Sequence, residues 1–133
     1  MKTILVIEDE WVIASVLEYV LSDAGYRVIT TPNGRVVLER SKAERPDLIL
    51  LDFMMPVMNG AATMQALKAD PDLKDIPVIL MTSLPERSVA KQAEGYRRYL
   101  SKPFLDSELL SAVRGVLEED GGSIDGGGAA MRP

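Results

Sequence analysis

Five short segments of strand character, among them the apolar runs at residues 48–51 and 78–81, alternate with five segments of helical periodicity along this chain. The strands are predicted at residues 3–7, 27–30, 48–51, 78–81 and 98–101. The helical segments are predicted at residues 10–24, 34–44, 60–69, 84–94 and 106–118. Regular alternation of strand and helix is typical of an α/β fold, in which helices cover both faces of a parallel sheet.

Glycine and proline residues set the predicted helix ends. Gly25 follows the first helix, Pro46 closes the second and Gly95 follows the fourth. The segment from Ser83 to Glu86 resembles a capping box with a proline inside the first turn, which predicts a helix start near Leu84.

The length of 133 residues indicates one domain with one core. We expect the domain to span residues 1–119, because residues 120–133 include five Gly and predict a disordered tail or linker. The net charge of −5 argues against a nucleic-acid-binding face. No signal peptide or membrane-spanning run is recognisable in the sequence, so a cytoplasmic protein is expected.

The chain contains no Cys and no His. The missing Cys residues exclude disulfides, thiol chemistry and zinc-thiolate sites. The missing His residues remove the usual general base and the usual transition-metal ligand.

Polar residues gather where four of the predicted strands end. Glu8 and Asp9 follow the first strand, Asp52 the third, Thr82 the fourth and Lys102 the fifth. In open α/β sheets, ligands bind outside the carboxyl ends of the strands, and these ends share one edge of a parallel sheet. The sequence therefore predicts that residues far apart along the chain meet in one site.

Three carboxylates placed together repel one another and raise one another's pKa values. Mg²⁺ relieves this repulsion, because it prefers oxygen ligands and is commonly held by one or two carboxylates together with a phosphate group. A bound metal would also neutralise an incoming phosphoryl group. We therefore expect Asp52 to act as a nucleophile that forms an aspartyl phosphate. Lys102 supplies a second cation, and the hydroxyl of Thr82 can donate to a phosphate oxygen.

Each of these residues also has a purely structural interpretation. Asp52 could cap the following helix, and the pair Glu8–Asp9 could cap the first helix. Thr82 could simply end a strand, and Tyr99 could be a half-buried core aromatic. Trp11 directly follows the acid pair and could be exposed near the site. Plain helix packing is the favoured interpretation of this residue, with contact to a probe or partner as the alternative.

These motifs resemble the receiver domain of bacterial two-component response regulators, over about residues 3–118. The resemblance lies in Glu8–Asp9, in the loop from Asp52 to Gly60, in Thr82 and in the sequence Tyr-Leu-Ser-Lys-Pro-Phe at residues 99–104. It implies a flavodoxin-like (βα)5 fold, a three-layer sandwich whose five parallel strands have the order 2-1-3-4-5. The span from Thr82 to Gly95 is slightly shorter than in typical receivers, which places a deletion in or before the fourth helix.

The resemblance also implies a Mg²⁺ site. Asp9 and Asp52 would ligate the ion directly, together with the backbone carbonyl of Met54, and Glu8 would act through a metal-bound water. Asp52 would be the phosphoacceptor and Lys102 would pair with the phosphoryl group.

A switch follows from the same resemblance. Thr82 and Tyr99 would be the switch pair, the peptide between Lys102 and Pro103 would be cis, and the face of helix 4, strand 5 and helix 5 would change on phosphorylation. The only catalysis expected is of the domain's own phosphorylation and dephosphorylation.

A sensor histidine kinase or a His-phosphotransfer protein would donate the phosphoryl group. The output would be a downstream protein target or an effector domain outside this sequence, and a homodimer formed on phosphorylation is a further option. Neither direct nucleic-acid binding nor membrane binding is expected.

Three other functions are alternatives to this one. A phosphorylation-independent binding module is suggested by the short fourth helix. Hydrolases with an Asp nucleophile commonly carry a second Asp two positions later, where this chain has Met54. A dinucleotide-binding fold lacks its Gly-rich turn after the first strand.

Overall fold

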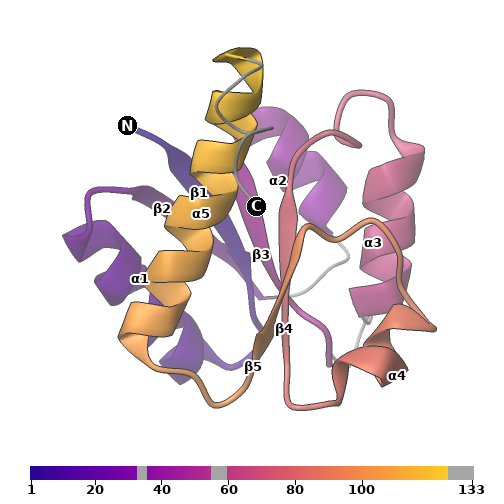
Figure 1. The fold of residues 1–133 in the computed structure, drawn as a ribbon, viewed down its shortest axis with the longest axis horizontal. Helices are drawn as coiled ribbons and strands as arrows, with labels where there is room; N and C mark the ends of the chain where they lie inside the picture. Colours follow the sequence, from indigo (N-terminus) through magenta and orange to yellow (C-terminus); the bar gives the residue numbers. More distant parts are fainter. Residues whose placement is uncertain (33–35, 55–59, 126–133) are drawn as a thin grey trace.

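The computed structural model describes residues 1–32, 36–54 and 60–125, and for residues 120–125 it describes the backbone alone. Five strands and five helices alternate along these residues (Figure 1). The strands are β1 (Thr3–Ile7), β2 (Arg27–Thr31), β3 (Leu48–Asp52), β4 (Val78–Thr82) and β5 (Arg98–Ser101). The helices are α1 (Trp11–Asp23), α2 (Val37–Glu44), α3 (Gly60–Ala69), α4 (Glu86–Ala90) and α5 (Asp106–Asp125).

The strands form one parallel sheet in the order β2-β1-β3-β4-β5. This order confirms the predicted flavodoxin-like fold. Every residue of β1, β3 and β4 is buried, as expected for strands that are covered on both faces. The edge strands β2 and β5 are only partly buried.

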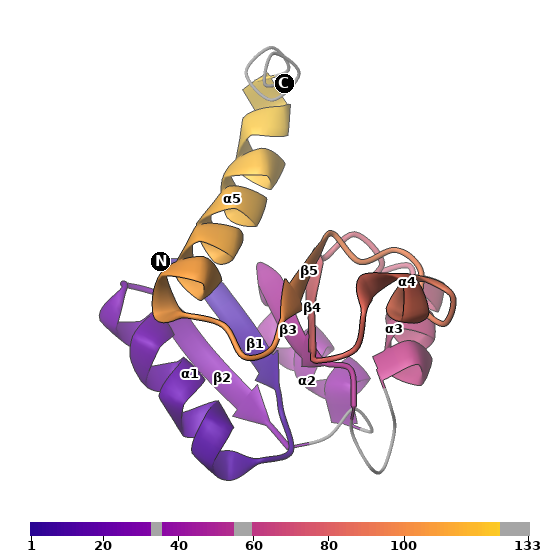
Figure 2. The ribbon, with the colours of Figure 1, turned by 60° about the horizontal axis from the view of Figure 1, so that its bottom comes forward.

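Alternate residues of the central strands supply two separate cores. Ile4, Val6 and Leu50 pack on the side of the sheet that carries α1 and α5. Leu5 and Leu51 pack on the opposite side, which carries α2, α3 and α4. Figures 1 and 2 show this division, with α1 and α5 side by side on one face of the sheet.

The fourth helix differs from its prediction. It was expected at residues 84–94, but α4 begins at Glu86 and ends at Ala90. The predicted capping box is wrong, because the N-cap is Pro85 and no side chain caps the helix. Few apolar side chains anchor this segment to the core, chiefly Val89 and Ala93, and a short helix gains its stability from such packing.

Three other helix boundaries need comment. The first helix has nearly its predicted extent, and Gly25 follows it with a φ of +100°, a conformation that suits glycine. The predicted start of the second helix at Gly34 lies outside the described residues. Helix α5 continues to Asp125, so its predicted end at Glu118 is wrong, and Figure 2 shows its last turns projecting beyond the sheet.

The division into a domain of residues 1–119 and a tail of residues 120–133 stays a prediction.

No helix among the described residues is both long enough and apolar enough to span a bilayer.

Candidate functional site

Strand register brings the predicted site residues to one edge of the sheet. Ile7 pairs with Leu51, so Glu8 and Asp52 end their strands at the same level. Asp52 pairs with Met81, and Thr82 pairs with Ser101, the residue before Lys102. Residues separated by up to 94 positions therefore become neighbours.

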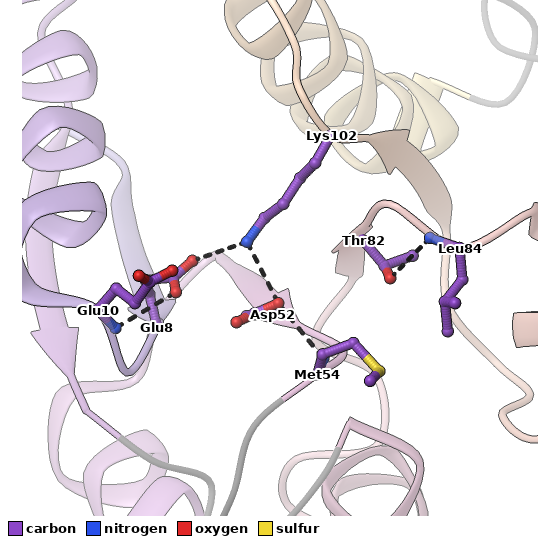
Figure 3. A network of polar contacts seen from close by, with 7 residues as sticks. All are labelled: Glu8, Glu10, Asp52, Met54, Thr82, Leu84 and Lys102. Carbon is purple, nitrogen blue, oxygen red and sulfur yellow. Dashed lines mark hydrogen bonds and ion pairs between the residues drawn. The ribbon is translucent and has the colours of Figure 1, made fainter.

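Lys102 lies between two of the acids (Figure 3). Its Nζ is 3.2 Å from Glu8 Oε1 and 3.3 Å from Asp52 Oδ1. Glu8 and Asp52 are almost completely buried, with 2% and 4% of their surfaces exposed. Buried charges need partners, and these two ion pairs explain why a lysine ends a partly buried strand.

Glu8, Asp9 and Asp52 form a cluster in which one carboxylate oxygen of each lies within 4.8 Å of the others. Oxygen donors at this spacing fit a hard divalent cation such as Mg²⁺. Asp9 is exposed, whereas both oxygens of Glu8 have internal partners, namely Lys102 Nζ and, at 3.4 Å, the backbone N–H of Glu10. This difference suits direct ligation by Asp9 and Asp52 better than direct ligation by Glu8.

The electrostatics of the cluster follow from burial and mutual repulsion. Burial, and then the charge of Asp52, raises the pKa of Glu8 to about 7, although Lys102 opposes the shift. Burial also raises the pKa of Asp52 against the attraction of Lys102. Burial alone would lower the pKa of Lys102, but Asp52 and Glu8 together outweigh it and raise that pKa. The site thus holds more negative charge than one lysine neutralises.

Hydrogen bonds from backbone N–H groups fix the residues on both sides of the loop after Asp52. The backbone N–H of Met54 donates to Asp52 Oδ1 at 3.3 Å, and the N–H of Gly60 donates to the carbonyl of Phe53 at 2.8 Å. A Cβ at position 60 would lie 2.6 Å from the Cα of Phe53, so only glycine permits this approach. Residues 55–59 of the predicted motif lie outside the described residues, and the role of the Met54 carbonyl stays a prediction.

The predicted switch residues meet at the backbone of Leu84. Thr82 is buried, and its Oγ1 accepts a hydrogen bond of 3.2 Å from the Leu84 N–H. Tyr99 is half-buried against the core, and its hydroxyl donates to the carbonyl of Leu84. The sequence did not single out Leu84, although its position two residues after a strand end could have suggested it.

A cleft of about 310 Å³ opens over these groups, and Asp9, Asp52, Met54, Thr82 and Lys102 contribute to its lining. Among the described residues, Glu10, Ile13 and Ser83 also line the cleft, and they were not predicted as site residues.

Three smaller expectations can be compared with the structure. The peptide between Lys102 and Pro103 is cis, as the resemblance implied. Trp11 is 77% exposed at the start of α1, and its contact with a partner stays a prediction. The N-cap of α1 is Glu10, without a side-chain cap hydrogen bond, but Glu8 Oε2 accepts from the Glu10 N–H at 3.4 Å, so Glu8 contacts the helix start as well as Lys102.

The family model "Response regulator receiver domain" matches residues 4–114. The chain is 39% identical over 118 residues to the probable transcriptional regulator ycf27 of Porphyridium aerugineum, covering 87% of this chain and 48% of that protein. The chain therefore spans about half the length of this curated relative.

Solved structures of receiver domains have the same fold. The receiver domain of a signal transduction histidine kinase from Syntrophus aciditrophicus matches with a TM-score of 0.82 and 38% identity, covering 89% of this chain and 91% of that one. The receiver domain of a sensor histidine kinase from Pseudomonas aeruginosa, solved with a magnesium ion coordinated in its active site cleft, matches with a TM-score of 0.76 and 30% identity. That match covers 88% of this chain and 94% of the other.

Proposed function

Because this chain belongs to the response regulator receiver domain family, we propose that it is a signalling switch controlled by phosphorylation of Asp52. The observation that carries the proposal is the meeting of Asp52 with two further acids and with Lys102 in one cleft. A phosphoacceptor needs an accessible carboxylate and compensation for the charge of the incoming group. Asp52 lines the cleft, which gives a donor a route to its carboxylate, and Lys102 together with a bound Mg²⁺ would supply the compensation.

In the proposed reaction an oxygen of Asp52 attacks the phosphorus of a phosphohistidine. The new O–P bond replaces the P–N bond, and the electron pair of the broken bond stays on the departing imidazole nitrogen, which takes up a proton. Asp9 and Asp52, with the Met54 carbonyl, would hold Mg²⁺, and Glu8 would bind it through water. The bound ion would offset the charge of the phosphoryl oxygens.

Lys102 lies 3.3 Å from the attacking carboxylate and would pair with the transferred group. Thr82 would donate its hydroxyl to a phosphoryl oxygen. In this structure the Thr82 Oγ1 accepts a hydrogen bond from the Leu84 N–H, and the Leu84 carbonyl accepts one from the Tyr99 hydroxyl. Movement of Thr82 would therefore disturb the position of Tyr99. The signal would thereby reach the face formed by α4, β5 and α5.

We propose a sensor histidine kinase or a His-phosphotransfer protein as donor, since the chain has no His of its own. The output would pass to another protein or to an effector segment outside this sequence. Turnover of an external substrate and binding to nucleic acid form no part of the proposal, and a cytoplasmic location stays a prediction.

The test is incubation of the folded protein with Mg²⁺ and acetyl phosphate, followed by intact mass measurement. We expect the mass of one phosphoryl group to be gained by the wild type, and none by Asp52→Asn. Asp75→Asn, which changes an exposed carboxylate outside the cleft, should be labelled like the wild type. Absence of labelling in the folded wild-type protein contradicts the proposal.

A second candidate function is a binding module that works without phosphorylation. The short α4 favours it, because this helix belongs to the proposed output face. It requires that Asp52→Asn leave partner binding unchanged, so a clear loss of binding in that variant would exclude it.

A further inference from the structure

Two tyrosines from the segment around β5 hold the start of α4. Tyr99 of β5 donates to the carbonyl of Leu84, and Tyr96, two residues before β5, donates to Glu86 Oε2 at 3.1 Å. Leu84 and Glu86 lie on either side of Pro85, the N-cap of α4. The helix start is therefore tied at two points to the chain that enters β5. The proposed switch uses only the Tyr99 contact.

The backbone around Tyr96 is fixed independently of α4. The N–H of Arg97 donates to the carbonyl of Val78 in β4 at 2.7 Å. On the other side, Gly95 turns the chain with a φ of +92°, a conformation that suits glycine. The ring of Tyr96 packs against the core on the side of the sheet that carries α2, α3 and α4. Tyr96 therefore presents its hydroxyl to α4 from a fixed support.

Helix α4 has few other constraints on its position. It has five residues and no side-chain cap, and Val89 is its only buried residue. Glu86 is exposed in its first turn. Burial, and then the Glu86 acceptor, raises the pKa of Tyr96, so the hydroxyl keeps its proton and remains a donor at neutral pH. Because hydrogen bonds to charged acceptors are stronger than neutral ones, this bond matters for so short a helix.

The Tyr96 contact is coupled to the buried strand end through the backbone. Thr82 Oγ1 accepts a hydrogen bond of 3.2 Å from the Leu84 N–H, so movement of Thr82 would displace Leu84. Glu86 follows two residues later, across Pro85, whose ring limits the rotation of the chain. Glu86 would therefore move with Leu84 while Tyr96 keeps its place beside β4, and the hydrogen bond would break. An interaction made in one conformation alone shifts the equilibrium between the two.

We infer that Tyr96 is a second positioning residue of the switch, whose hydrogen bond to Glu86 holds α4 in its unphosphorylated position. The inference rests on the proposed function, because it concerns the response of α4 to phosphorylation of Asp52. Since the bond must break when the domain switches, it sets how readily the domain responds. Removal of the bond should therefore favour the phosphorylated conformation.

Beryllofluoride tests the inference without a kinase, because it binds a carboxylate as a tetrahedral substitute for a phosphoryl group. Isothermal titration calorimetry gives its affinity for the full chain in the presence of Mg²⁺. We expect Tyr96→Phe to bind beryllofluoride about three- to tenfold more tightly than the wild type, a factor equivalent to the net contribution of one hydrogen bond.

Variants of the acceptor show whether the effect belongs to this bond. Glu86→Ala should tighten binding by a similar factor, and the double variant should gain no more than either single variant. Glu86→Gln removes the same charge but keeps an acceptor oxygen, so it should stay closer to the wild type. Tyr19→Phe is the matched control, because it removes an exposed hydroxyl of α1 outside the cleft lining and should leave the affinity unchanged.

A purely structural role for Tyr96 gives a different result. If the bond stabilised α4 equally in both conformations, Tyr96→Phe would lower the free energy of unfolding in urea without changing the affinity for beryllofluoride. Equal affinities of Tyr96→Phe and the wild type, or additive gains in the double variant, would overturn the inference.

Hydrogen exchange separates this inference from the proposed function. Without Mg²⁺ or beryllofluoride, we expect the amides of α4 to exchange faster in Tyr96→Phe than in the wild type. A wild type that is neither labelled by acetyl phosphate nor bound by beryllofluoride, with this faster exchange intact, would defeat the proposed function while Tyr96 still holds α4. Normal labelling of the wild type, with unchanged exchange and affinity in Tyr96→Phe, would defeat the Tyr96 inference alone.

Discussion

The edge of the sheet that carries Asp52 and the neighbouring α4 segment are built in opposite ways. At the edge, the ends of three strands place the carboxylates of Glu8 and Asp52 within 3.3 Å of the Lys102 ammonium group, although burial disfavours all three charges. In the α4 segment a helix of five residues holds to the core chiefly through Val89 and lacks a side-chain cap.

The contrast shows that the strand ends can hold electrostatically unfavourable groups, whereas the α4 segment is held by little packing. Strands β1, β3 and β4 are fully buried, so their ends are fixed well enough to hold electrostatically unfavourable groups in a defined arrangement. The α4 segment has few such constraints, which suits a region that changes shape in a switch. The following predictions separate electrostatic cost at the edge from weak packing in α4.

The largest effect of all the predicted variants is expected for Asp9→Asn, and it is a loss of Mg²⁺ affinity. Asp9 is the exposed member of the acid cluster and a proposed direct ligand, so removing its charge should weaken Mg²⁺ affinity by at least the roughly 10- to 100-fold that loss of an outer-shell partner costs, while leaving stability nearly unchanged. Isothermal titration calorimetry with Mg²⁺ measures the effect. Glu10→Gln removes a charge next to the cluster without removing a member of it and should cost far less, so equal losses in the two variants would contradict the proposed ligand set.

Glu8→Gln should stabilise the metal-free protein near neutral pH by about 1–3 kcal/mol. Because the pKa of Glu8 rises from 4.5 to about 7 on folding, the folded state keeps a proton that the unfolded state loses between these values. The free energy of unfolding of the wild type should therefore fall as pH rises from about 4.5 to about 7.

Urea unfolding between pH 5 and about 8, without Mg²⁺, compares the two proteins. The part of the pH dependence that comes from Glu8 should vanish in the variant. If the free energy of unfolding changed with pH identically in both proteins, ionisation of Glu8 would not destabilise the folded state.

The same contrast explains what the sequence could predict. The positions of Glu8, Asp52, Thr82 and Lys102 followed from strand ends, because parallel strands share one edge and their register fixes which residues meet. The sequence could not show that Lys102 contacts Glu8 rather than Asp9. That choice depends on side-chain conformations and on which carboxylate remains exposed.

Helix ends were harder to predict. The segment Ser83–Glu86 has the composition of a capping box, but α4 has Pro85 as its N-cap and no side chain caps it. Helix α5 continues past Glu118 into a segment that contains glycine, although the low helix propensity of glycine predicted that the helix would end before it. The exposure of Val12 and Val16 could not be predicted either, because α1 is apolar on more than the face that meets the core.

Val89→Ala should lower the free energy of unfolding by about 1–2 kcal/mol, since it removes buried methyl groups. Val113→Ala makes the same change in the long helix α5, where the surrounding structure has less freedom to relax, so its cost should be larger. Urea unfolding of both variants measures the difference. A cost for Val89→Ala that equals or exceeds that of Val113→Ala would show that α4 is as firmly packed as α5.

Ser83→Ala should have the smallest effect, below about 0.5 kcal/mol in the free energy of unfolding. A serine that caps a helix typically contributes about 1 kcal/mol, because its hydroxyl accepts from an unpaired backbone N–H. In this chain α4 starts after Pro85, no side chain caps it, and Ser83 is exposed. Urea unfolding of Ser83→Ala against the wild type measures the difference, with Ser88→Ala as a neighbouring serine control. A loss of about 1 kcal/mol confined to Ser83→Ala would restore the capping box that the sequence suggested, and α4 would then be held by its own start as well as by Val89.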